Sequence, residues 1–193
     1  MFTRIRKRGR GWVFSAIDFL DLGSRSSVDT ALSRMAAANS IRRVARGLYD
    51  LPQENPIMGL TPPDIQNVAK ALAGKSGTRL QPTGAYAANL LGLSEQVPAK
   101  VVFLTDGISK NVRLGKLEIS LKRTSPRMMA TAGTTSGLLI QALRHLGEAN
   151  VSDDTLKRLN SRLSPADRKR LRTHAAFAPA WIGRIMRQLA SMG

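Results

Sequence analysis

Apolar residues recur at helical spacing in the stretch SSVDTALSRMAAAN, which covers residues 26–39. The repeating apolar positions fall on one side of a helix and predict a buried stripe made of Val28, Ala31, Leu32 and Met35. Ser26 followed by Asp29 resembles a capping box and predicts the start of this helix. Asn39 suits the left-handed position at its end.

A shorter helix is predicted before this one, within WVFSAIDFLDLG. Ser15 suits an N-cap with Asp18 three residues later, and Gly23 suits the C-terminal stop. Helical spacing then places Ile17 and Leu20 toward the interior. The two predicted helices are separated by LGSRS, a connection that contains glycine, as the turns of helix-turn-helix units often do.

Two short apolar runs follow the second helix. IRRV and GLYDL are joined through residues 45–47, a combination that predicts a tight hairpin. Residues 2–8 also suit the end of a first helix. Helices followed by a two-stranded ribbon have the order of a winged helix-turn-helix, and we predict such a DNA-binding domain over residues 1–54.

The remainder of the chain alternates between helical and strand patterns. Four prolines and a glycine in residues 51–64 predict a boundary with little regular structure. After it we expect a helix capped by Thr61, then strands and helices in alternation, and finally two or three helices in the tail. The predicted fold class is therefore mixed α/β (α+β), with a C-terminal domain over residues 61–193 that ends in helices.

The net charge of the chain indicates a class of binding partner. The chain has 30 Lys and Arg against 13 Asp and Glu, a net charge of +17. A positive field of this size attracts polyanions, so nucleic acid is the leading partner class, with an acidic protein or an anionic membrane surface as the alternatives. The absence of cysteine excludes disulfides and thiolate metal sites. We find no signal peptide and no apolar run near the roughly 20 residues that span a bilayer, and therefore expect a cytoplasmic protein.

The predicted second helix has an outward face that suits double-stranded DNA. Short hydroxyl side chains let a helix lie deep in the major groove, and arginine bonds guanine with two hydrogen bonds. Arginines on the hairpin suit phosphate or the neighbouring minor groove. The candidate DNA-binding residues are Arg25, Ser26, Ser27, Thr30, Arg34, Arg42, Arg43 and Arg46. The alternative is an ordinary solvated face, because arginines in so basic a chain fall near one another by chance.

Catalysis has little support in the sequence. His145 and His174 lie apart in predicted helices, and no phosphate-binding loop, nucleophile elbow or zinc-protease motif is present. A metal-dependent nuclease that uses Asp106 and Glu118 is the best enzymatic alternative. Its lysine, Lys122, would stand about 13 Å from Glu118 along a strand, too far to share a metal ion with it. We expect no catalytic residue, no metal ligand and no cofactor.

A third hypothesis is a basic interaction surface in the tail. Eight Lys and Arg lie between residues 157 and 184. Their spacing is compatible with charged helix faces, which are usually only solvated. The functional alternative to a solvated surface is a second nucleic-acid contact, or attraction to an acidic partner.

Three segments of the chain resemble the AbiEi-type abortive-infection antitoxin regulators. These are GRGWVFSAIDFLDLGSRSSVDTALSRMAAANSIRRVARGLYDLP, then RLQPTGAYAANLLGLSEQVPAKVVFLTDG, and last RMMATAGTTSGLLIQALRHLG continuing to APAWIGRIMRQL. The resemblance covers most of the chain. The phrases GLYD and LTDG are fairly specific only in combination.

The resemblance implies a two-part function. The N-terminal part would bind the promoter of its own operon and repress it, and the C-terminal part would counter a nucleotidyltransferase-like toxin. Systems of this kind are classed as type IV toxin–antitoxin systems, in which no stable complex with the toxin is implied. A transcriptional regulator without any toxin is the alternative. Both a monomer on two half-sites and a dimer remain open, as does the operator sequence.

Overall fold

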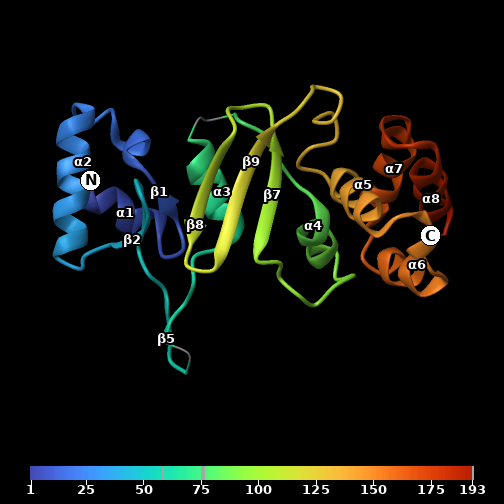
Figure 1. Cartoon of the computed structure of the whole chain (residues 1–193), viewed down its shortest axis with the longest axis horizontal. Coiled ribbons are helices and arrows are strands. Elements are labelled where there is room, and N and C mark those ends of the chain that lie inside the picture. The colour runs from blue at the N-terminus through green and yellow to red at the C-terminus, as the bar shows by residue number, and fades with distance from the viewer. Residues whose placement is uncertain (58, 75–76, 193) are drawn as a thin grey trace. The chain divides into compact units, whose positions relative to one another are not determined.

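The computed structural model describes residues 1–57, 59–74 and 77–192. They form two compact units (Figure 1). Unit 1 consists of Met1–Thr78 and Lys110–Ile119, and unit 2 of Arg79–Ser109 and Ser120–Gly193. Eight α-helices and three sheets occur within the described part of the chain, which confirms the mixed α+β class. None of the described helices is long and apolar enough to cross a bilayer.

Unit 1 begins with helices and a small antiparallel sheet. Its strands follow the order β1-β3-β2, so β3 is central and β2 is an edge strand. A second sheet consists of β4 and β5 alone. In chain order the elements are α1 (Phe2–Arg8), β1 (Val13–Phe14), the 3₁₀ helix η1 (Ala16–Phe19), α2 (Arg25–Ala37), β2 (Arg42–Ala45), β3 (Leu48–Asp50), β4 (Glu54–Asn55), β5 (Gly59–Leu60), α3 (Ile65–Ala73) and β8 (Lys110–Leu114).

An aromatic cluster forms the centre of unit 1. The rings of Phe14 and Phe19 meet edge to face with centroids 5.6 Å apart, and Trp12 lies 4.8 Å from Phe14. Leu32 from α2 and Ile5 from α1 are fully buried beside them. Such ring pairs add stability beyond the burial of their area. The core therefore fixes α2 against the sheet through its apolar stripe.

The element before α2 is a single 3₁₀ turn, shorter than the helix we predicted. Asp18 accepts a hydrogen bond from the backbone N–H of Ser15 at 2.8 Å, as expected for its cap. A 3₁₀ helix has three residues per turn, so Ala16 and Phe19 share the inner side. Ile17 and Leu20, which helical spacing placed inside, are exposed instead.

The proline-rich segment has little regular structure, as we predicted: of its described residues, only 54–55 and 59–60 lie in strands, β4 and β5. Glu54 pairs with Leu60 and Asn55 with Gly59, which makes an antiparallel hairpin. The next helix, α3, is capped by Asp64, whose carboxylate accepts from the N–H of Asn67 at 2.8 Å. Thr61 is therefore not its cap, because both prolines precede the helix and leave the cap position to a carboxylate.

Unit 2 combines strands with a helical tail. Strands β6 and β7 pair antiparallel, with Leu80 opposite Thr105 and Pro82 opposite Phe103. The tail forms three α-helices, as the sequence predicted. The elements are β6 (Leu80–Pro82), α4 (Gly84–Leu90), β7 (Lys100–Thr105), β9 (Leu117–Arg123), α5 (Thr135–Leu146), η2 (Glu148–Asn150), α6 (Asp153–Asn160), α7 (Pro165–His174), η3 (Ala175–Phe177) and α8 (Ala180–Ser191).

Two tail arginines hold helix ends together. Arg168 donates to the carbonyl of Leu189 at 2.7 Å and to the side chain of Asn160 at 2.6 Å. Arg172 donates to the carbonyl of Ala190 at 3.2 Å. The last carbonyls of a helix lack partners within it, so these guanidinium groups satisfy the end of α8. Part of the basic tail is therefore structural.

Candidate nucleic-acid interface

Helix α2 starts two residues earlier than the sequence indicated. Ser24 has an extended backbone, and its hydroxyl accepts from the N–H of Ser27 at 3.3 Å. The hydroxyl oxygens of Ser24 and Ser27 lie 2.9 Å apart, and that of Ser26 lies 3.2 Å from Ser24. Ser26 is thus inside the first turn, and its predicted role as the cap was wrong. Asp29 pairs with Arg25 instead of completing a capping box.

Ser24→Ala is expected to lower the free energy of unfolding by about 1 kcal/mol, because one amide of the first turn loses its acceptor. Chemical denaturation of the full chain measures this loss. Ser33→Ala is the matched control, since Ser33 is exposed in the middle of α2 and alanine is the better helix former there. Equal stability of the two variants would contradict the assignment of Ser24 as the cap.

The outward face of α2 carries the hydroxyl and guanidinium groups that the sequence placed there. Val28 and Leu32 are buried, whereas Ala31 and Met35 are only partly covered. Opposite Val28 and Leu32 the helix lines a shallow depression of about 550 Å³, which Ala31 borders although the sequence placed it in the buried stripe. Its lining consists of Ser26, Ser27, Thr30, Ala31 and Arg34. Four of the eight candidate residues therefore share one exposed surface.

Arg25 stands at the edge of this face in an ion pair. Its Nε lies 2.8 Å from a carboxylate oxygen of Asp29, one helical turn along, and both side chains are exposed. Exposed pairs of this spacing contribute about 0.3–0.5 kcal/mol. A phosphate can therefore replace the carboxylate at little cost.

Arg42 is held by unit 1 itself. Its Nε and one terminal nitrogen bind the two carboxylate oxygens of Asp50 at 2.9 and 2.5 Å. Asp50 stands directly opposite Arg42 on β3, and its side chain is only 2% exposed. The remaining terminal nitrogen donates to the carbonyl of Thr61 at 3.1 Å. Hydrogen bonding to Asp50 raises the pKa of Arg42, which remains charged and engaged.

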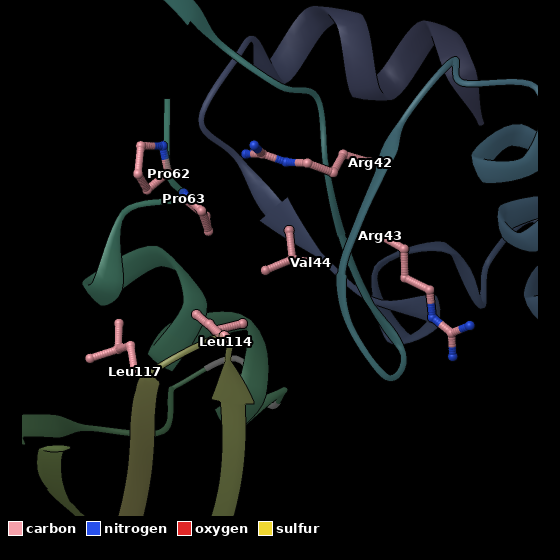
Figure 2. Close-up of a pocket in the computed structure, with 8 residues that line it drawn as sticks. Arg42, Arg43, Val44, Pro62, Pro63, Leu114 and Leu117 are labelled. Carbon is pink, nitrogen blue, oxygen red and sulfur yellow. The ribbon is translucent and has the colours of Figure 1, made fainter. Parts of the chain in front are cut away.

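Arg43 and Arg46 are the available cations of the hairpin. Figure 2 shows the side chains of Arg42 and Arg43 pointing in different directions, as successive residues of a strand do. Both Arg43 and Arg46 are exposed, and neither has a hydrogen bond or ion pair within the described residues. Gly47 takes the positive φ of 72° that the tight turn after Arg46 requires. The hairpin therefore presents two of its three arginines to solvent.

The basic N-terminus is a helix rather than an arm. Arg4 binds Asp21 with two hydrogen bonds, at 2.7 and 2.6 Å. Arg6 lies over the ring of Phe2 and Arg8 over that of Trp12, with the guanidinium carbon 4.8 and 5.5 Å from the ring centroids. Arg10 donates to the carbonyl of Pro52. Most of these arginines therefore contact other residues of unit 1.

Sequence reasoning missed Asp50 as the residue that separates the roles of the neighbouring arginines. A signal for it was present, because an aspartate within the apolar run GLYDL must find a cation if it is buried. Counting back from the tight turn alone would place Asp50 opposite Arg43, but a bulge between Arg43 and Ala45 shifts the register and places it opposite Arg42. The pairing distinguishes the structural arginine from the exposed one.

The carboxylate of Asp106 is engaged in an ion pair in unit 2. Arg79 donates to it from its side chain at 2.8 Å and from its backbone at 2.9 Å. These bonds hold the pKa of Asp106 below its ordinary value of 3.8. No group of three or more His, Cys, Asp or Glu within the described ranges is arranged to hold a metal ion.

Asp106→Asn is expected to destabilise the protein by no more than about 1 kcal/mol near neutral pH, because the pair is largely exposed. A carboxyl whose pKa is lowered by folding stabilises the protein above its unfolded pKa. The difference between wild type and variant should therefore be complete well above pH 3.8 and shrink as the pH falls below it. Unfolding measured from pH 7 to pH 2.5 tests this. A difference that is constant over that range would contradict the pairing.

Unit 1 has the architecture of a small helical domain with a three-stranded antiparallel sheet, and unit 2 adds a sheet and a helical tail. The chain belongs to a family of unknown function, DUF6088, whose family model matches residues 1–171. Searches of curated proteins and of solved structures give no significant match.

Proposed function

We propose that the protein binds double-stranded DNA through unit 1 and acts as a sequence-specific repressor of its own operon. The element order α1, β1, η1, α2, β2, β3 supports a winged helix-turn-helix, with η1 in the place of the first helix of the pair. In that arrangement α2 is the recognition helix and the β2–β3 hairpin is the wing.

The division of the cations into paired and unpaired ones carries this proposal. Residues 1–52 contain ten Lys and Arg. Six of these touch an acidic, aromatic or carbonyl partner: Arg4, Arg6, Arg8, Arg10, Arg25 and Arg42. The four without such a partner among the described residues are Lys7, Arg34, Arg43 and Arg46. Three of these four belong to the predicted recognition helix and wing.

Each group has a distinct role in the proposal. Ser27 and Thr30 are short enough to let α2 enter the major groove, where their hydroxyls bond base edges or phosphates. Arg34 supplies a forked donor for guanine. Arg43 and Arg46 bind phosphate, which positions the helix without reading sequence. Ser26 and Arg25 lie near the start of α2, where its free N–H groups favour an anion.

The test compares two DNA duplexes. Affinity is measured by fluorescence anisotropy for the DNA upstream of the gene and for a scrambled duplex of equal composition, each at two salt concentrations. We expect tighter binding to the upstream DNA and a loss of affinity with salt for both. Replacing Ser27, Thr30 and Arg34 by Ala should reduce the preference between the duplexes. Equal affinity for both duplexes, unchanged by salt, would remove the repressor function.

The antitoxin part of the proposal rests on the segments that resemble the AbiEi-type regulators. It requires a functional link to a nucleotidyltransferase-like toxin. We expect a gene for such an enzyme next to this one, and expect co-expression of the chain to relieve the growth arrest that the enzyme causes. An adjacent enzyme gene whose toxicity persists in the presence of this protein would contradict the antitoxin function and leave DNA binding unaffected.

A further inference from the structure

The β4–β5 hairpin forms an arm with an apolar end. The backbone N–H of Thr61 donates to the carbonyl of Gln53 at 2.8 Å, which closes the hairpin at its base. Ile57 is 94% exposed and Leu60 is 56% exposed. Figure 1 shows the hairpin that contains β5 extending away from β1 and β2. A two-stranded hairpin is marginally stable alone, so its exposed apolar side chains would gain from packing against another surface.

The charge of this region disfavours a polyanionic partner. Residues 47–69 contain no Lys or Arg, in a chain that has 30 of them. DNA, RNA and anionic membranes are attracted to the basic faces and gain nothing from this segment. An acidic protein would also be drawn elsewhere. The arm is instead suited to an apolar receptor, and because it carries no cation it can approach a second copy with a charge of +17 with less repulsion than the basic faces can.

Unit 1 itself offers such a receptor, the groove shown in Figure 2. The groove has a volume of about 330 Å³, and its walls come from β2, the segment after β5, and the β8–β9 turn. Its apolar lining consists of Val44, Pro62, Pro63, Leu114 and Leu117, and Arg42, Arg43 and Gly115 complete it. Pro62 directly follows Thr61, so the groove lies at the base of the arm. The outer edge of β2, which has no partner strand in its sheet, borders it.

We propose that two copies of the chain associate by exchanging arms, with Ile57 of each copy placed in the groove of the other. A twofold axis requires the same patch on both copies, and antiparallel arms satisfy this because each tip then meets the partner's base. Ile57 is the fourth residue after Gln53, an extended length of about 13 Å. Backbone groups at the edges of β2 and of the arm can pair in the same step. This inference does not depend on DNA binding.

The first experiment measures the mass of the full-length protein by light scattering over a range of concentrations. We expect wild type to reach twice the mass of the chain, and Ile57→Asp to remain a monomer at every concentration. Because Ile57 is almost fully exposed, its replacement leaves the core intact. Ile108→Asp is the matched control, since Ile108 is 67% exposed in unit 2 and should leave the dimer unchanged. A monomeric wild type, or a dimer that survives Ile57→Asp, overturns the proposal.

The second experiment tests whether Ile57, at the tip of the arm, lies in the groove of the partner copy. The chain has no cysteine, so single replacements create unique thiols. Ile57→Cys protein mixed with Val44→Cys protein should form disulfide-linked heterodimers on mild oxidation. Ile108→Cys mixed with Val44→Cys should not. Faster linking of Ile57→Cys protein to itself would indicate that the tips meet each other, and would overturn arm exchange into the groove.

The effects of Ile57→Asp on DNA affinity and on mass distinguish an arm that binds DNA from an arm that binds a second copy. Proteins that bend DNA insert apolar side chains between bases, and Ile57 follows a proline as such a wedge could. DNA affinity and mass are therefore measured on the same Ile57→Asp preparation. Weaker DNA binding by this variant, with the mass distribution of wild type, overturns the dimer proposal. Loss of the dimer with retained binding to a single half-site supports it.

Discussion

Replacing Arg43 and Arg46 together by Ala is expected to weaken binding to duplex DNA by roughly a hundredfold at 0.1 M salt. Each phosphate contact that is lost lowers the slope of log affinity against log salt by about 0.9, which corresponds to roughly tenfold at that concentration. Upstream and scrambled duplexes should lose affinity by the same factor, because phosphate contacts carry no sequence information. Titrations of both duplexes at several salt concentrations measure the factor and the slope.

The matched control removes equal charge from the tail. Lys169 and Arg170 are exposed on α7, and neither side chain makes a hydrogen bond or ion pair in the described part of the chain. Replacing both by Ala changes the net charge as much as the hairpin variant does. We expect a loss of less than threefold from the smaller overall field. If the two variants lose the same affinity, net charge rather than the hairpin accounts for binding.

Arg42→Ala is expected to lower the free energy of unfolding by about 3–5 kcal/mol, the largest effect of any single replacement proposed in unit 1. The reason is Asp50, whose carboxylate stays buried after its partner is removed. Arg42→Lys should recover only part of the loss, since an ammonium group cannot bind both carboxylate oxygens with the fork of a guanidinium. Urea denaturation followed by circular dichroism gives the stabilities.

Two further variants separate the ion pair from the strand that carries it. Arg43→Ala changes the next residue of β2 and should alter stability by less than about 0.5 kcal/mol, because Arg43 is exposed. Arg42→Met combined with Asp50→Leu removes both charges and should be more stable than Arg42→Ala alone. An equally unstable double variant would mean that the loss comes from packing rather than from the unpaired carboxylate.

The elements with strong local signals could be predicted from the sequence. Helix α2 has a regular apolar stripe, and the ends of α5 and α7 are marked by Gly147 and by Ser164 with Pro165. The β2–β3 turn follows from Gly47. Short elements escaped prediction, because a single 3₁₀ turn such as η1 gives too few residues to establish a period. The β4–β5 hairpin escaped because its prolines occupy positions flanking the paired residues.

The sequence predicts which residues belong to the candidate site. It does not predict which of its arginines are exposed and which are held by a partner within the protein. Spacing alone places Thr30 and Arg34 opposite the buried Val28 and Leu32. Spacing does not say which arginine of a hairpin turns inward, because that depends on a partner from the neighbouring strand. Asp50 settles the matter for Arg42 through register, a relation between strands rather than a local property.

The bond from Arg42 to the carbonyl of Thr61 joins parts of the chain that are 19 residues apart. One guanidinium group thereby ties the edge strand of the hairpin to the root of the arm. Immobilising or cutting the arm should consequently change the rate at which β2 amides exchange with deuterated water, although no covalent bond near them is altered. The β2–β3 hairpin and the β4–β5 arm are therefore coupled. Amide exchange in β2 should show whether the arm is bound to a partner, without any label on the arm.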